Sequence, residues 1–177
     1  MTRDEFASLA LSYLEEVTAY ARRLCRVAWD ADDLVQAAFE QAFRSFEQLE
    51  DPARCRAWLF RIARNLHIDR MRRAKARSEL RLVEPGDSLA PEPSVSPETV
   101  ERLTAKELDA ALAQLPDEQR EAVLLCDLWG FRYAEIAEIT DAPVGTVRSR
   151  ISRARSELAR LLIAAQKSHG AKAGGKS

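Results

Sequence analysis

The chain has 177 residues, of which 46% are hydrophobic and 31% charged, an ordinary balance for a globular protein with a buried core. With six glycines and no stretch that alternates apolar and polar residues, the sequence disfavours a β-rich fold. No apolar run approaches the ~20 residues that a membrane span needs, and the acidic N-terminus lacks the features of a signal peptide. We therefore expect a cytoplasmic protein without membrane insertion.

The first half of the chain is predicted to be helical. Apolar residues over 6–24 recur at three- and four-residue steps, which indicates an amphipathic stripe. Asp30 is a plausible N-cap for a second helix, whose apolar face runs over 34–46. After a break at Asp51-Pro52, a third helix is expected from about Arg54 to Arg77, with its arginines outward. Its inward face is predicted to be Trp58, Ile62, Leu66 and Met71.

Residues 82–101 are predicted to form a flexible, Pro-rich, acidic linker. The stretch 82–99 contains four prolines and no Lys or Arg. Proline at that density excludes a continuous helix, and the acidic, Ser-rich composition cannot pack a core. We therefore expect an all-α protein of two small helical domains, residues 1–81 and 102–165, followed by a disordered tail at 166–177.

The second domain is predicted to contain a helix-turn-helix. Its first helix has one apolar stripe, made of Leu103, Leu108, Leu112 and Leu115. Pro116 then starts another helix, for which Gly130 is a C-cap candidate. A short helix over 133–139, a turn over 140–142 and a long helix opening with Pro143 complete the helix-turn-helix pattern.

The long helix has an apolar face and a slim polar face. At about 100° per residue, an inward sector of about 80° holds Val144, Val147, Ile151, Ala154 and Leu158. The opposite side carries small polar residues and one arginine, bordered by further arginines, which suits insertion into the DNA major groove. A solvent-facing amphipathic helix is the alternative, but it would normally mix Glu with its Arg, and only Glu157 is present. We expect Arg148, Ser149, Ser152 and Arg153 to face base edges and Thr146, Arg150 and Arg155 to hold phosphates.

The net charge of −1 conceals two basic blocks. Residues 53–81 have a net charge of +8 and residues 142–177 of +7, whereas 1–52 and 82–141 carry −6 and −10. Two Arg-rich blocks separated by acidic ones indicate two places where phosphates are held. The acidic first segment has no use for DNA, which suggests a protein partner.

Three cysteines and two histidines offer no metal site. Cys25, Cys55 and Cys126 lie far apart without a C-x-x-C pair, and a zinc site needs about four clustered ligands. We expect no metal and no cofactor, and we interpret Cys25 and Cys126, at apolar helical positions, as buried reduced thiols.

Several segments resemble the bacterial RNA polymerase sigma factors of the extracytoplasmic-function (ECF) type. They are DDLVQ at 32–36, WLFRIARNL at 58–66 and APVGTVRSR at 142–150, together with Leu115-Pro116 and GFRYAEIA at 130–137. The match covers roughly residues 10–163 in the family's order. One departure is Ala37, where the family commonly has a Glu after DLVQ.

This resemblance implies a subunit that directs core RNA polymerase to promoters and has no catalysis of its own. The first domain, similar to sigma region 2, would dock on the β′ coiled coil, and the second, similar to region 4, would contact the β flap and read the −35 element. An anti-sigma factor is an expected further partner. The implied docking residues are Asp33, Leu34, Val35 and Gln36. The residues implied in reading and melting the −10 element are Trp58, Arg61, Arg64, Asn65, Arg70, Arg72 and Arg73.

Asn65 is singled out because its position resembles the start of the loop with which this family captures a flipped base. An amide can pair with a base edge there, and the pocket must offset the few kcal/mol that extrusion costs. The alternative is that Asn65 caps a helix end.

Two other functions fit the sequence less well. A stand-alone helix-turn-helix regulator would need a ligand or dimerisation module, and the first half offers a basic helix without a pocket signature. An enzyme acting on nucleic acid would need clustered carboxylates or a metal held by His and Cys, and neither pattern is present.

Overall fold

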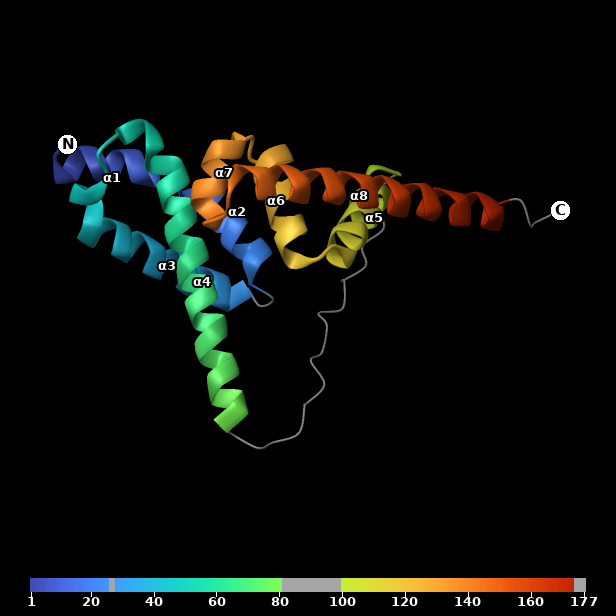
Figure 1. The fold of residues 1–177 in the computed structure, drawn as a ribbon, viewed down its shortest axis with the longest axis horizontal. Helices are drawn as coiled ribbons and strands as arrows, with labels where there is room; N and C mark the ends of the chain where they lie inside the picture. Colours follow the sequence, from blue (N-terminus) through green and yellow to red (C-terminus); the bar gives the residue numbers. More distant parts are fainter. Residues whose placement is uncertain (26–27, 81–99, 174–177) are drawn as a thin grey trace. The chain divides into compact units, whose positions relative to one another are not determined.

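The computed structural model describes residues 1–25, 28–80 and 100–173, and the regular secondary structure of these residues is entirely helical. They form two units, the first built on helices α1 to α4 and the second on α5, α6, α8 and most of α7 (Figure 1). The all-α, two-domain prediction is confirmed. The predicted linker lies outside the described residues except for its last two, which open α5.

The first unit begins with two short helices where the sequence showed one continuous stripe. A capping box starts α1, because the Thr2 hydroxyl accepts a hydrogen bond from the Glu5 amide and the Glu5 carboxylate accepts one from the Thr2 amide at 2.7 Å. The helices are α1 (Arg3–Leu11), α2 (Leu14–Leu24), α3 (Ala28–Ser45) and α4 (Cys55–Leu80), with short 3₁₀ turns at Phe46–Gln48 and Pro52–Arg54.

An aromatic cluster forms the centre of the first core. Phe6 is completely buried, and its ring lies 5.2 Å from that of Phe43, 5.4 Å from that of Phe46 and 6.1 Å from the Trp58 indole. These rings come from α1, the end of α3, the 3₁₀ turn that follows it and the start of α4. The packing therefore fixes how α4 crosses α3, which decides where the basic side chains of α4 point.

Two local predictions for this unit are wrong. Because α3 begins at Ala28, Asp30 lies inside its first turn and is not the N-cap. Met71 is 58% exposed, since the later turns of α4 extend past the helices that cover its first half (Figure 1).

The second unit has four helices, of which α5, α6 and α8 supply its small apolar core cluster. Its helices are α5 (Val100–Gln114), α6 (Asp117–Asp127), α7 (Tyr133–Thr140) and α8 (Val144–Ala173). The core cluster comprises Leu112, Leu115, Val123 and Ala154, with Leu124 and Leu158 packed against it. Leu108, predicted to belong to the apolar stripe, is exposed and lies outside this cluster.

The predicted start of α6 is confirmed, because Pro116 stands at its N-cap, but the prediction that Gly130 is its C-cap is wrong. The C-cap is Leu128, and Gly130 follows two residues later with a φ of +68°, a left-handed conformation that glycine adopts without a Cβ penalty. The Gly130 amide donates to the Cys126 carbonyl at 3.1 Å, and the Phe131 amide donates to the Leu125 carbonyl at 3.0 Å.

At its C-terminal end α8 extends to Ala173, so it includes residues that were predicted to form a disordered tail. Ala and Lys, which make up four of the eight residues 166–173, have high helix propensity. Within the described part of the chain, none of these helices combines the length and the apolar character that a bilayer crossing requires.

Candidate nucleic-acid interface

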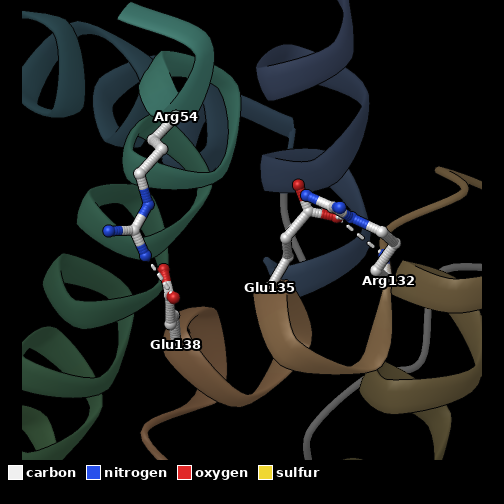
Figure 2. Close-up of polar contacts among 4 residues, drawn as sticks. All are labelled: Arg54, Arg132, Glu135 and Glu138. Carbon is white, nitrogen blue, oxygen red and sulfur yellow. Dashed lines mark hydrogen bonds and ion pairs between the residues drawn. The ribbon is translucent and has the colours of Figure 1, made fainter. Parts of the chain in front are cut away.

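The helix-turn-helix is formed by α7, a tight turn and α8. Glu135 accepts a hydrogen bond from the backbone amide of Arg132 at 2.8 Å and one from its Nε at 3.3 Å, which satisfies a free donor at the start of α7 (Figure 2). Asp141 takes a φ of +50° in the turn, and the Ala142 amide donates to the Ala137 carbonyl at 3.1 Å. The turn therefore sets the direction of α8 without glycine.

The inward face of α8 largely matches the predicted sector. Val147, Ile151 and Ala154 are buried, and Leu158 is half-buried. Val144 is exposed, because it lies in the first turn of the helix, before the seam that α8 forms with α6 begins. The apolar seam thus fixes which residues of α8 face away from the protein.

The outer face of α8 carries the residues predicted to read bases. Arg148, Ser149, Ser152 and Arg153 are all exposed. The Ser149 hydroxyl donates to the Thr146 carbonyl at 2.9 Å. Neither Arg148 nor Arg153 forms an ion pair with any residue that the structure describes, so both guanidiniums can bind a ligand without breaking a contact.

The arginines predicted to hold phosphates make contacts inside the unit. Arg155 donates to both carboxylate oxygens of Asp127, from Nε at 3.1 Å and from Nη2 at 2.5 Å. Arg150 pairs with Glu118, and its side chain is only 20% exposed. Both acidic partners lie on α6. The Arg155–Asp127 pair is bidentate, which adds geometric specificity, and the Arg150–Glu118 pair is a single contact. Both arginines therefore connect α8 to α6 as well as contributing charge to the surface.

Arg155 and Asp127 also affect each other's ionisation. The hydrogen bonds from Arg155 lower the pKa of Asp127, against the opposing effect of burial, and those to Asp127 raise the pKa of Arg155. The pair is therefore charged throughout the physiological pH range. Sequence reasoning missed Asp127 and Glu118, because nothing in their local sequence distinguishes them from other surface acids.

In the first unit, part of the basic block lies on the surface of α4. Arg61, Arg72 and Arg73 are exposed, and Arg72 approaches Asp69 only at 3.9 Å. Arg64 is half-buried. Asn65 is exposed and lies in the middle of α4, which continues without a break on both sides of it.

The position of Asn65 excludes one interpretation and corrects another. It does not cap a helix end, because α4 extends from Cys55 to Leu80. The loop that the resemblance placed at Asn65 is also absent from this position. The connection between α3 and α4 lies instead at residues 46–54 and contains two short 3₁₀ turns. An exposed amide on a continuous helix remains available to a ligand.

Two further residues of the predicted −10 set contact neighbouring helices, and Arg70 remains exposed while doing so. Trp58 is half-buried, with its indole edge-on to Phe6. Arg70 donates from Nη2 to the Asp33 carbonyl at 3.1 Å and from Nη1 to the Asp30 carbonyl at 3.5 Å. Both side chains therefore connect α4 to its neighbours.

The DLVQ segment divides between surface and core. Asp33 and Gln36 are exposed, and Gln36 donates to Glu40 at 3.1 Å. Leu34 is completely buried and Val35 is 8% exposed, so the prediction that they form part of a docking surface is wrong. These two apolar side chains instead hold α3 in the core, and the surface that remains is polar.

The cysteines are free thiols in different surroundings. Cys55 is completely buried, and burial raises its pKa to about 11. The prediction of burial is wrong for Cys25 and Cys126, which are half-buried near helix ends. Cys25 Sγ lies 3.8 Å from His67 Nδ1. Among the residues whose placement is described, no three His, Cys, Asp or Glu side chains gather in a way that could hold a metal ion.

Comparison with known protein families matches both units. The model "Sigma-70 region 2" matches residues 9–77, and the model "Sigma-70, region 4" matches residues 105–158. The chain is 38% identical over 153 residues to the ECF RNA polymerase sigma factor EcfG of Rhodopseudomonas palustris, covering 86% of the chain and 82% of the relative. It is 37% identical over 160 residues to SigM of Mycobacterium tuberculosis, covering 90% and 78%.

A third relative is longer than this chain. SigE of Mycolicibacterium smegmatis is 38% identical over 157 residues, and the match covers 83% of the chain but 60% of the relative. Among solved structures, the sigma factor RpoE of Bartonella quintana, determined with the anti-sigma factor NepR, matches with a TM-score of 0.74 and 31% identity over 89% of the chain and 96% of the other. CnrH, determined with the cytosolic domain of CnrY, matches with a TM-score of 0.62 and 31% identity, covering 92% and 90%.

Proposed function

The chain belongs to the ECF RNA polymerase sigma factors, and we propose that it binds core RNA polymerase and directs it to promoters whose −35 and −10 elements it reads with α8 and α4. Sigma factors act in promoter-specific transcription initiation and are not themselves enzymes; the polymerisation chemistry belongs to the core. The site of action is therefore the cytoplasm, where bacterial transcription takes place.

The outer face of α8 is the observation that carries the proposal for the −35 element. Arg148 and Arg153 are exposed, unpaired within the described residues, and separated by small serines that let the helix approach the groove closely. A guanidinium can donate two hydrogen bonds to a guanine edge. Thr146, Arg150 and Arg155 flank this face; Arg150 and Arg155 would share their charge between α6 and the DNA backbone.

For the −10 element the proposal rests on the exposed part of α4. Arg61, Arg72 and Arg73 provide positive charge for the phosphates of a displaced strand, and Asn65 provides an amide that can pair with a base edge. Trp58 supports this face from below by packing on Phe6. Arg64 contributes charge at the edge of the same surface.

Core polymerase is proposed to dock on α3 through Asp33 and Gln36, with the β′ coiled coil as the partner, and on the second unit through the β flap. Residues 1–81 would thus act as a region 2 domain and residues 102–165 as a region 4 domain, joined by residues 82–101. The solved relative RpoE of Bartonella quintana was determined with the anti-sigma factor NepR, which supports an anti-sigma factor for this chain as well.

The experiment that tests the function is run-off transcription with purified core polymerase and DNA from upstream of the chain's own gene. We expect a transcript that requires the chain and disappears when either promoter element is scrambled. A stand-alone helix-turn-helix regulator, which the two family matches disfavour, would bind a symmetric site and would not make core polymerase initiate.

A further inference from the structure

The guanidinium of Arg70, a residue of α4, is directed toward a neighbouring helix. It reaches the main chain of α3, donating to the Asp33 carbonyl at 3.1 Å and to the Asp30 carbonyl at 3.5 Å. These carbonyls belong to the first two turns of α3, which also carry the exposed docking residue Asp33. A guanidinium held this way cannot at the same time make a full set of contacts with a DNA phosphate.

A second contact of α4 lies one turn earlier on the same face. His67 Nδ1 is 3.8 Å from Sγ of Cys25, the residue that caps the C-terminus of α2. Residues three apart on a helix are neighbours on its surface. Through His67 and Arg70, α4 therefore contacts the end of α2 and the beginning of α3. The Arg70 charge is also felt at Cys25, where it opposes the rise of the thiol pKa caused by burial and by Asp30.

The guanidinium of Arg70 lies beside the N-terminal turns of α3. A cation is ordinarily unfavourable there, because the helix dipole places positive partial charge at a helix N-terminus. In α3 this cost is offset by the carboxylates of Asp30, Asp32 and Asp33 in the same two turns. Because the guanidinium binds main-chain oxygens, it fixes the position of the helix and leaves the Asp33 carboxylate exposed to solvent and to a partner.

We propose that Arg70 is a positioning residue for polymerase docking, which anchors the first turns of α3 to α4 so that Asp33 and Gln36 are presented in a fixed orientation. This inference rests on the proposed function, because it deepens the assignment of the docking surface. It also removes Arg70 from the residues that hold DNA phosphates, and it makes the −10 helix a support for the polymerase-binding helix.

The test measures the affinity of the full chain for core polymerase by fluorescence anisotropy. Arg70→Ala should weaken binding by about 5- to 10-fold, which corresponds to the net value of an ordinary hydrogen bond, because the guanidinium is exposed to solvent. Arg70→Lys, which retains the charge and one donor direction, should recover part of the loss. Arg22→Ala is the matched control, because Arg22 is an exposed arginine of α2 without an ion pair to any described residue. It should change the affinity less than 2-fold.

Two additional measurements separate positioning from other roles. In a double-mutant cycle with Asp33→Asn, the combined loss should be smaller than the product of the single losses, because Arg70 acts through the position of Asp33. The salt dependence of promoter binding by the saturated holoenzyme should be unchanged by Arg70→Ala.

Three results would overturn the inference. The first is an unchanged affinity of the Arg70→Ala chain for core polymerase. The second is a double variant whose loss of affinity equals the product of the losses of Arg70→Ala and Asp33→Asn. The third is a shallower salt dependence of promoter binding in Arg70→Ala, which would make Arg70 a phosphate contact. Failure of the proposed function itself would look different, because the unsubstituted chain would then not bind core polymerase at all.

Discussion

The clearest separation of roles on α8 should come from two arginines that lie two positions apart. Arg153 is exposed and makes no ion pair with any described residue, whereas Arg155 forms two hydrogen bonds with Asp127. Replacing either one by alanine removes one guanidinium group from α8. The two variants differ in what the lost guanidinium contacts. Arg153→Ala should therefore affect mainly the sequence preference of DNA binding, and Arg155→Ala should also affect the stability of the free chain.

The expected magnitudes follow from these contacts. A bidentate contact with a base is worth about 1–3 kcal/mol of discrimination, so Arg153→Ala should lower affinity for the preferred −35 sequence by about 5- to 150-fold. Its free energy of unfolding should change by less than about 0.5 kcal/mol, as for most exposed substitutions. Arg155→Ala breaks an ion pair whose side chains are 51% and 45% exposed, so solvent screening limits its cost in stability to about 1 kcal/mol. Binding should weaken evenly across sequences.

The assay is binding of holoenzyme to promoter fragments in which each base pair of the −35 element is changed in turn, combined with thermal unfolding of the free chain. Arg160→Ala serves as a control, because Arg160 pairs with Glu157 further along α8. Arg153→Ala should flatten the preference at one position, most plausibly a guanine. If it lowers affinity equally on all fragments, α8 does not read bases through Arg153 and the reasoning is wrong.

Three further results are expected. Asp33→Lys should weaken capture of core polymerase while changing the free energy of unfolding by less than about 1 kcal/mol, and an unchanged pull-down would contradict the docking assignment. Asn65→Ala should slow open-complex formation, measured with permanganate, on an ordinary template more than on one pre-melted across the −10 region, and should alter the preferred base at one position. Because Asn65 is exposed, a drop in melting temperature without a change in base preference would show a structural role instead. Cys55 should react with a thiol reagent at pH 8 only after unfolding, whereas Cys25 and Cys126 should react in the native chain. Since the folded-state pKa of Cys55 is raised from its usual 9.0 to about 11, the stability that its protonated form contributes should be lost as pH rises through that interval, as urea titrations at pH 8 and 10.5 can measure.

Helical periodicity in the sequence was sufficient to predict the buried seam of α8, because burial along a helix follows its 3.6-residue repeat. Val147, Ile151 and Ala154 are all buried as expected. Periodicity was insufficient where a helix runs past its neighbours. Met71 continues the apolar stripe of α4 but is exposed, because periodicity indicates the direction of a side chain and does not reveal where the covering helices end.

The site was less predictable than the fold because its charges pair across large sequence separations. Arg150 and Glu118 are 32 residues apart, and Arg155 and Asp127 are 28 apart. A count of basic residues along the chain does not distinguish arginines that pair with acids of another helix from arginines that are available to DNA. For the same reason the main-chain contacts of Arg70 with α3 could not be predicted, since they depend on how two helices cross.

The two ion pairs between α6 and α8 connect core packing to DNA recognition. On the helical wheel, Arg150 and Arg155 lie on opposite edges of the buried seam formed by Val147, Ile151 and Ala154. Each pairs with an acid of α6, and the pairs therefore bracket the seam on both sides. Arg153 lies farther from the seam and is left for the groove. A rotation of α8 by about 100°, which is one residue position, would bury a different set of side chains. It would also move Arg150 and Arg155 away from their acidic partners on α6. The acids of α6 and the apolar seam thus favour the same rotation of α8, and it is this agreement that selects which of its arginines are available to DNA.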